Sequence, residues 1–258
     1  MSTTIFSKEG QIGKIILNRP EVFNSFNREM ALAVQDHLKD CGSDSNIRAI
    51  YLTGMGKAFC AGQDLQEVTE ENDLNITRIL KEHYNPIIHL LRDIEKPIIC
   101  AINGVAAGAG ANIALACDIT IASDKASFIQ AFSKIGLIPD SGGTFILPRL
   151  IGLQRATALT MLGDKISAEL AVQMGMIYKN DPHESLETEA WQITQTLAQM
   201  PTKGLGLTKR ALNRALRNDL EEQLTLEVEL QTAAGATNDF REGVQAFLEK
   251  RKPVFKGE

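Results

Sequence analysis

The chain has 258 residues, which suffices for one large domain or for a domain with a smaller appendage. Its 32 acidic and 27 basic residues leave a net charge of −5, so there is no electrostatic basis for binding nucleic acid. The hydrophobic share of 44% and the charged share of 23% are ordinary for a soluble globular protein.

The cysteines contain no C-x-x-C pair, and three of them lie in apolar or alanine-rich surroundings. They are Cys41, Cys60, Cys100 and Cys117. We therefore expect buried free thiols in a reducing compartment. The N-terminus shows no basic region followed by an apolar segment, which argues against a secretory signal. The least polar window, 98–122, contains Asp118, which is costly in lipid. We therefore expect a cytoplasmic protein with no membrane partner.

Short apolar runs alternate with helical patterns in the first half of the chain. Strands are predicted at 3–7, 14–17, 48–53, 98–102, 119–122 and 127–129, and helices at 27–39 and 77–94. Asn27 is placed to cap the first helix, and Pro86 to kink or break the second. The segment 54–65 is predicted to be a loop. The alternation argues for an α/β layered core.

Helical patterns dominate after Asp140. Helices are predicted at 153–162, 167–174, 184–200, 204–217, 220–233 and 240–250, with one further strand at 176–179. Pro201 marks a soft boundary between a core, 1–200, and a C-terminal helical region, 201–258. An amphipathic helical tail on an α/β core often packs across a subunit boundary, so we expect an oligomer. Packing of the tail on its own core agrees equally well with the periodicity.

One glycine-containing stretch, N-G-V-A-A-G-A-G-A-N-I-A-L-A-C-D (103–118), follows the strand predicted at 98–102. It is typical of a tight turn that opens into a helix. Gly104, Gly108 and Gly110 leave the backbone open to close approach. The free N–H groups and the positive end of a helix can hold a developing negative charge, such as an enolate oxygen. The alternative is that these glycines serve only tight packing of a helix against a sheet.

A second such loop, 57–65, follows the strand predicted at 48–53. Ligands of α/β sheets tend to lie at the carboxyl ends of strands. If the two strands are parallel neighbours, the loops face one pocket, and one N–H from each could bind a single carbonyl oxygen. Each such donor is worth roughly 3–4 kcal/mol of transition-state stabilisation where mutagenesis has measured it.

The sequence lacks the motifs of several other enzyme and cofactor-binding classes. The spacing of the phosphate-binding loop, the dinucleotide fingerprint and the G-x-S-x-G elbow are absent. The four histidines show no metal-ligand spacing. They are His37, expected on a solvated helix face, and His83, His89 and His183, expected at the surface or an interface. General acid–base chemistry by carboxylates remains, with backbone amides as its electrostatic partner.

Three segments of the sequence resemble a known family. A-F-C-A-G-Q-D-L (58–65), N-G-V-A-A-G-A-G (103–110) and I-G-L-I-P-D-S-G-G-T (135–144) resemble the crotonase superfamily, also called enoyl-CoA hydratase/isomerase. L-N-R-P (17–20) and the final helical segment agree, so the resemblance covers essentially the whole chain. It implies an α/β fold, a spiral of ββα units with a C-terminal helical region that trimerises. A homotrimer or a dimer of trimers is therefore expected.

The resemblance also implies a ligand. It is a coenzyme A thioester whose carbonyl oxygen is held by the backbone N–H groups of Gln63 and Ala109. Residues implied to line the substrate and coenzyme A path are Ala61, Gly62, Gln63, Asp64, Leu65 and Gly110. Coenzyme A is part of the substrate, and neither a further cofactor nor a metal is implied.

Hydratases of this family use two glutamates to position and ionise a water. The matching positions here are Asn112 and Phe132, so ordinary hydration is disfavoured. Asp140 lies in I-P-D-S-G-G, where the family's isomerases often carry an acid that removes a proton at one carbon and returns it at another. Apolar neighbours such as Ile138 are expected to raise its pKa by desolvation. The alternative is that Asp140 only caps a helix that begins near Ser141.

Further segments resemble the isomerase branch that acts in phenylacetate degradation. They are 24–27, 84–86, 132–140 and 241–244. That branch converts the ring 1,2-epoxide of phenylacetyl-CoA to oxepin-CoA, and the resemblance implies Asp140 as the proton-transfer residue. The alternatives are a Δ3,Δ2-enoyl-CoA isomerase of fatty-acid oxidation, a residual hydratase, and a non-catalytic acyl-CoA-binding subunit.

Overall fold

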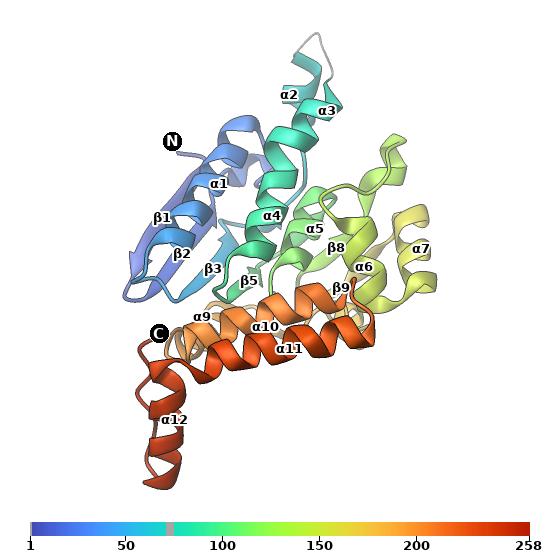
Figure 1. Cartoon of the computed structure of the whole chain (residues 1–258). Coiled ribbons are helices and arrows are strands. Elements are labelled where there is room, and N and C mark those ends of the chain that lie inside the picture. The colour runs from blue at the N-terminus through green and yellow to red at the C-terminus, as the bar shows by residue number, and fades with distance from the viewer. Residues whose placement is uncertain (1, 71–74) are drawn as a thin grey trace.

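The computed structural model describes residues 2–70 and 75–258, which form two β-sheets surrounded by helices (Figure 1). The strands are β1 (Thr4–Glu9), β2 (Ile12–Leu17), β3 (Ala49–Gly54), β4 (Ala58–Cys60), β5 (Ile98–Ile102), β6 (Val105–Ala107), β7 (Ile119–Ser123), β8 (Ser127–Ile129), β9 (Lys165–Ser167) and β10 (Lys179–Asp181). The helices are α1 (Arg28–Ser43), α2 (Leu65–Glu70), α3 (Ile76–Arg78), α4 (Asn85–Asp93), α5 (Ala109–Ala116), α6 (Gly143–Ile151), α7 (Leu153–Leu162), α8 (Ala168–Gln173), α9 (Leu186–Ala198), α10 (Thr202–Ala215), α11 (Leu220–Gly235) and α12 (Asn238–Leu248). Two short 3-10 helices, η1 (Pro20–Val22) and η3 (Ala131–Ile135), and one π-helical segment, η2 (Ile79–Tyr84), complete the chain.

Successive strand pairs divide between the two sheets. The larger sheet has the order β1-β2-β3-β5-β7-β10, and the smaller one has the order β4-β6-β8-β9. The pairs β3–β4, β5–β6 and β7–β8 thus each give one strand to each sheet, and every unit stacks in parallel on the one before it. The result is the expected α/β spiral of ββα units.

Helices cover both faces of the larger sheet. α1, α4 and α5 pack against one face, where Ile50, Ile98 and Leu91 belong to the main apolar core. A second apolar cluster lies on the opposite face, where Tyr51 and Ile99 meet residues of α9. Because β5 is buried along its whole length, its sequence is apolar throughout rather than alternating, as expected for a central parallel strand.

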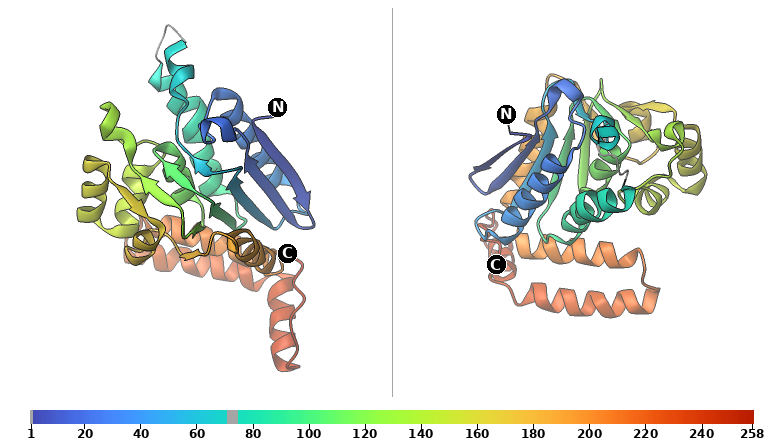
Figure 2. Two further views of the ribbon diagram at one scale, coloured as in Figure 1. Left: turned by 180° about the vertical axis from the view of Figure 1, so that it is seen from behind. Right: turned by 90° about the horizontal axis from the view of Figure 1, so that it is seen from above.

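The last three helices begin directly after Pro201. α10 and α11 run antiparallel and side by side beneath the sheets, and α12 projects away from them (Figures 1 and 2). The buried Arg48 anchors the C-terminal tail, since its guanidinium donates to the Phe255 carbonyl oxygen over 2.9 Å. Among the described residues, none of the helices combines the length and the apolar character that a membrane span requires.

Several sequence predictions are wrong in detail. The predicted loop 54–65 contains β4, and the turn after β5 contains β6. The strand predicted at 176–179 lies instead at β10, while β9 was missed. These strands have three residues each, which is too short for a visible alternation of polar and apolar side chains. The helix predicted at 77–94 is interrupted by η2, and the predicted break at Pro86 lies where η2 changes to α4, which begins at Asn85.

Two of the four histidines also differ from expectation. His37 stacks on Phe6 and hydrogen-bonds the hydroxyl of Thr4 over 2.9 Å, so it lies partly buried between α1 and β1. His83 is buried in η2, only 4% exposed. The four cysteines are buried and free, as predicted.

Candidate active site

The two glycine-containing loops lie side by side. The strands β4 and β6 form a parallel ladder that places Cys60 opposite Ala106. A Cβ added to Gly62 would lie 3.1 Å from the carbonyl oxygen of Ala107 and 3.6 Å from the backbone nitrogen of Ala109. The backbone of the first loop therefore passes directly beside the N-terminus of α5. The strands that precede the loops, β3 and β5, are parallel neighbours as the prediction required.

Gly110 permits this approach. A Cβ at this position would lie 2.6 Å from the Cys60 sulfur and 2.7 Å from the Cys60 carbonyl oxygen. No side chain fits there, so Gly110 does serve close packing of the helix, which was the alternative considered for the glycines of this stretch. Complete burial raises the pKa of the Cys60 thiol to about 12, which keeps it a neutral packing group. Close packing at Gly110 is also what brings the start of α5 next to Gly62.

The N–H of Gln63 points away from its neighbouring strand. The Phe26 N–H donates to the Gly62 carbonyl oxygen over 2.7 Å, and the Asp64 N–H donates to the Phe26 carbonyl oxygen over 2.9 Å. In this parallel bridge Gln63 lies between the two bonded groups, so its own N–H faces the opposite side. Ala109 is the first residue of α5, and its N–H has no acceptor within the helix. In the part of the chain that the structure describes, neither N–H has a hydrogen-bond partner.

Asp140 lies between η3 and α6 and is held against α5. The side-chain amide of Asn112, on α5, donates to the Asp140 carbonyl oxygen over 2.9 Å. The Gly143 N–H donates to the same oxygen over 2.8 Å. The Asp140 carboxylate accepts a hydrogen bond of 2.8 Å from the Ser141 hydroxyl. Asp140 is thus one hydrogen bond away from the helix whose first N–H belongs to Ala109.

Burial raises the pKa of the Asp140 carboxyl above its ordinary value, and the hydrogen bond from Ser141 opposes the shift. The direction agrees with the sequence prediction, but one proposed cause is wrong. Ile138 is 79% exposed, so its side chain is directed to solvent and contributes little to the desolvation. The desolvation therefore comes from other neighbours of the carboxyl. Tyr84 lies near enough for the Asp140 charge to raise the pKa of its phenol.

Asp140 does not cap α6. The helix begins at Gly143, its capping residue is Gly142, and no side chain accepts a hydrogen bond from its first turn. Ser141 adopts a left-handed backbone conformation with φ of 49°, which turns the chain between Asp140 and the helix. The capping alternative weighed from the sequence is therefore wrong, and the carboxylate is left without that structural role.

The two positions that carry glutamates in hydratases hold buried, non-acidic side chains. Asn112 is 1% exposed and accepts a hydrogen bond of 2.9 Å from the amide of Gln130, which is itself 3% exposed. Phe132 is buried as well, and its ring ends next to Gly108, just before α5. Neither side chain can act as the acid or base that the resemblance implies at these two positions in hydratases.

Tyr84 is a site residue that the sequence reasoning missed as such. It closes η2, is 1% exposed, and its hydroxyl donates to the side-chain oxygen of Gln63 over 2.8 Å. The sequence analysis predicted a helix with a kink or break at Pro86 and used Tyr84 only as part of a resemblance. A buried tyrosine beside an in-helix proline was the available signal, because buried hydroxyls usually find a partner.

Residues expected along the coenzyme A path divide into two groups. Ala61 and Leu65 are exposed. Gly62, Asp64 and Gly110 are buried, and Gln63 is partly exposed. The Asp64 carboxylate forms an ion pair of 2.9 Å with Arg19. Asp64 therefore fixes the loop through its side chain and can meet a ligand only through its backbone.

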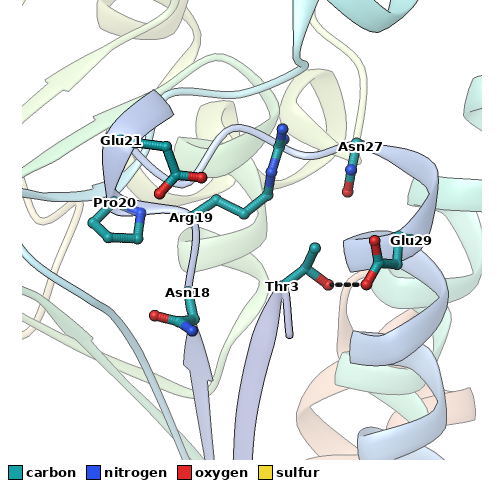
Figure 3. Close-up of a pocket in the computed structure, with 7 residues that line it drawn as sticks. All are labelled: Thr3, Asn18, Arg19, Pro20, Glu21, Asn27 and Glu29. Carbon is teal, nitrogen blue, oxygen red and sulfur yellow. Dashed lines mark hydrogen bonds between the residues drawn. The ribbon is translucent and has the colours of Figure 1, made fainter. Parts of the chain in front are cut away.

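A separate polar pocket of about 470 Å³ lies between the end of β2 and the start of α1 (Figure 3). It is lined by Thr3, Asn18, Arg19, Pro20, Glu21, Asn27 and Glu29. None of the predicted site residues belongs to this lining. Its single cation, Arg19, is already engaged by Asp64 and by the carbonyl oxygen of Ser25.

The sequence profile described as "Enoyl-CoA hydratase/isomerase" matches residues 7–258. The chain belongs to the enoyl-CoA hydratase/isomerase family. It is 49% identical, over 94% of both chains, to an Escherichia coli protein named 1,2-epoxyphenylacetyl-CoA isomerase. It is 36% identical to a Streptococcus mutans protein named trans-2-decenoyl-[acyl-carrier-protein] isomerase, over 98% of this chain and 97% of the relative.

Solved structures agree with this assignment. A Mycobacterium abscessus enoyl-CoA hydratase/isomerase superposes with a TM-score of 0.95 at 37% identity, covering 99% of this chain and all of the other. An enoyl-CoA hydratase from Bacillus anthracis superposes with a TM-score of 0.94 at 34% identity, with the same coverage. As a member of this family, the chain is an enzyme of the isomerase and hydratase type that acts on acyl-CoA thioesters.

Proposed function

We propose that this enzyme is an acyl-CoA isomerase in which the N–H groups of Gln63 and Ala109 hold the thioester oxygen and Asp140 moves a proton beside it. The observation that carries the proposal is the position of Asp140. It is a partly buried carboxyl of raised pKa, bracketed to α5 by Asn112, with no capping role. The absence of a carboxylate at Asn112 and Phe132 favours isomerisation over hydration.

The chemistry for a 3-enoyl thioester is a proton shift. The Asp140 carboxylate removes a proton from C2, and the electron pair of that C–H bond moves toward the thioester carbonyl. The negative charge that develops on the carbonyl oxygen is stabilised by two N–H dipoles, one of them at the positive end of α5. The Asp140 carboxylic acid then returns the proton at C4, the double bond lies between C2 and C3, and the carboxylate is regenerated. No atom is gained or lost.

The proposed substrate is the ring 1,2-epoxide of phenylacetyl-CoA, isomerised to oxepin-CoA. Support comes from the 49% identity to the E. coli protein named for that epoxide. The second candidate is a straight-chain 3-enoyl-CoA, and the S. mutans relative, named for a decenoyl substrate, favours it. In either case the ligand would pass Ala61 and Leu65, with coenzyme A as part of the substrate and no further cofactor.

The decisive experiment is Asp140→Asn, assayed on the ring epoxide and on a 3-enoyl-CoA. Asparagine keeps the acceptor for the Ser141 hydroxyl and removes only the proton-transfer group. A loss of turnover on the order of 10²–10⁴-fold is expected for removal of a general acid–base group. Near-normal turnover of both substrates would end the assignment.

A panel of coenzyme A thioesters separates the remaining candidates. Relative rates on aromatic and aliphatic thioesters distinguish the two substrates, and water addition to crotonyl-CoA would reveal a hydratase. Binding of acyl-CoA without any isomerised product would instead indicate a non-catalytic binding subunit.

We also propose that the enzyme is cytoplasmic and forms a homotrimer or a dimer of trimers, with the helical region 201–258 at the subunit contact. Exposed apolar side chains on α11 and α12, such as Val228 and Phe247, support that assembly.

A further inference from the structure

We propose that Tyr84 is a positioning residue, which sets the oxyanion-binding loop by holding the side chain of Gln63. The inference rests on the proposed role of the Gln63 N–H and goes beyond it. Tyr84 touches no substrate atom in this scheme. It acts through Gln63, and the contacts that carry it come from three separate elements of the fold.

Both ends of the Gln63 side-chain amide are held. Its oxygen accepts from the Tyr84 hydroxyl over 2.8 Å, and its nitrogen donates to the Glu67 carboxylate over 3.1 Å. The other Glu67 oxygen accepts from the backbone N–H of Arg28 over 2.8 Å, at the first residue of α1. This chain of hydrogen bonds joins η2, α2 and α1 to one side chain of the loop. The carboxylate can only accept, so it fixes the amide nitrogen toward Glu67 and leaves the amide oxygen for the Tyr84 hydroxyl.

The main chain of Gln63 is held by a residue that touches Tyr84. Phe26 forms the parallel bridge that turns the Gln63 N–H outward. The rings of Phe26 and Tyr84 pack with their centroids 5.8 Å apart and their planes inclined by 58°. One aromatic residue therefore orients the backbone of Gln63, and its packed neighbour orients the side chain. Together they leave the N–H little freedom to rotate.

Tyr84 remains a neutral donor at any working pH. Burial raises the pKa of its phenol well above the ordinary value, and the nearby Cys60 and Asp140 act in the same direction. Tyr84 is also the last residue of a π-helical segment, a rare backbone conformation that often marks functional sites. Misplacement of a preorganised dipole costs most in the transition state, where the oxygen carries its charge.

The test is Tyr84→Phe, which keeps the ring and removes the hydroxyl. The proposal expects kcat/KM to fall about tenfold, the effect of one hydrogen bond, with the loss in kcat rather than in KM. Gln63→Met removes the amide but keeps the backbone N–H, and it should give a similar loss. Because both variants break the same bond, the double variant should lose less than the product of the two single losses. If Tyr84→Phe does not fold, Gln63→Met carries the test alone.

Tyr51→Phe is the matched control. Tyr51 is also 1% exposed, but its ring packs edge-on against Trp191 on the opposite face of the larger sheet. This variant should keep the wild-type kcat/KM. Equal losses in Tyr51→Phe and Tyr84→Phe would overturn the proposal, because any buried hydroxyl would then have the same effect.

A spectroscopic readout separates this inference from the proposed function. Phenylacetyl-CoA with a ¹³C-labelled carbonyl is bound to each variant, and the infrared carbonyl stretch is compared with that of free ligand. Wild type should lower the stretching frequency, and Tyr84→Phe should lower it less. If Tyr84→Phe had the same carbonyl frequency and the same kcat as the wild type, the role of Tyr84 would be refuted, while the isomerase activity would stand. If the wild type turned over no thioester, the proposed function would fail, yet the infrared shift would still report on Tyr84.

Discussion

The side-chain amide of Asn112 donates a hydrogen bond of 2.9 Å to the main-chain carbonyl of Asp140. Asn112 lies in the first turn of α5, close to Ala109, whose N–H points out of the start of the helix. In the proposed site, one short helix therefore supplies both an N–H for the thioester oxygen and the side chain that holds the main chain of Asp140. In the proposed reaction, Asn112 thus positions the residue that transfers the proton.

Asn112→Asp tests the hydrogen bond from the Asn112 amide to the Asp140 carbonyl oxygen. Aspartate has the same shape but cannot donate when ionised, and it would face the Asp140 carbonyl oxygen in a buried position. We expect the free energy of unfolding to fall by about 1–3 kcal/mol, because the Asp140 carbonyl oxygen loses one of its two donors and faces a buried carboxylate instead. We also expect kcat/KM to fall at least tenfold, since Asp140 loses its fixed position. Urea unfolding and steady-state kinetics measure the two effects.

The control for this variant is Asn213→Asp. The amide of Asn213 likewise donates to a main-chain carbonyl oxygen, that of Arg92, over 2.8 Å, but it lies on α10. Its kcat/KM should stay at the wild-type value. Full activity of Asn112→Asp would show that the Asp140 main chain is held by its other contacts alone.

The pH dependence of the reaction should report on Asp140. The carboxyl must be ionised to remove a proton, and burial raises its pKa above 3.8. As pH falls through the raised pKa, the group becomes protonated and kcat/KM should decline, so the acidic limb lies above pH 3.8. Asp140→Asn should lack this limb in whatever activity remains. A limb at or below the ordinary aspartate value in the wild type would contradict the assignment.

The same shift predicts an effect on stability. The folded state holds the Asp140 proton more tightly than the unfolded chain, so this group favours folding below pH 3.8 and loses that contribution as pH rises through its folded pKa. At neutral pH the desolvated carboxylate is a net cost. Asp140→Asn should therefore unfold at higher urea concentration than the wild type at pH 7, with the gain disappearing below pH 3.8. Lower stability at pH 7 would indicate that the carboxylate has a structural role.

Much of this architecture was predictable from local patterns. The helix at α7 was predicted with its bounds, and the capping of α1 by Asn27 is confirmed by a hydrogen bond of 2.9 Å from the Met30 N–H. β5 was evident from its continuous apolar run. These features depend on periodicity and on contacts within a few residues. Motif spacing located the loop at Gln63, the start of α5 and Asp140.

The remaining features depend on contacts between distant segments. β4 and β6 exist because they pair with each other across some 45 residues, and neither run of three residues shows a pattern of its own. The exposure of Ile138 could not be predicted from the sequence, because the sequence does not show whether an apolar residue next to a carboxyl packs against the core or faces solvent. Tyr84 meets Gln63 from the end of η2, a π-helical segment that the sequence pattern did not reveal.

The assembly should depend on the apolar surface of the C-terminal helices. Phe247, on α12, is 81% exposed, and α12 projects away from the rest of the molecule (Figure 1). We expect Phe247→Asp to dissociate an oligomer whose mass is a multiple of three times the 28.2 kDa chain. Light scattering after size exclusion measures this. Leu153→Asp, on α7 at the other end of the molecule and 75% exposed, is the comparison that should leave a trimer intact. A wild-type monomer would rule out the assembly.

Gly110→Ala should disrupt the site through packing alone. The new methyl group would lie 2.6 Å from the Cys60 sulfur and 2.7 Å from the Cys60 carbonyl oxygen, so α5 must move away from β4. We expect a loss of about 1–3 kcal/mol in the free energy of unfolding and a larger loss in activity, because the N–H of Ala109 moves with the helix. Adding Cys60→Ala should not restore either property, since the carbonyl oxygen remains in the way. Gly235→Ala, at the end of α11 with nothing within 4 Å, should change stability by at most about 1 kcal/mol and leave activity unchanged. Rescue by Cys60→Ala would show that the thiol, rather than the backbone of β4, dictates the glycine.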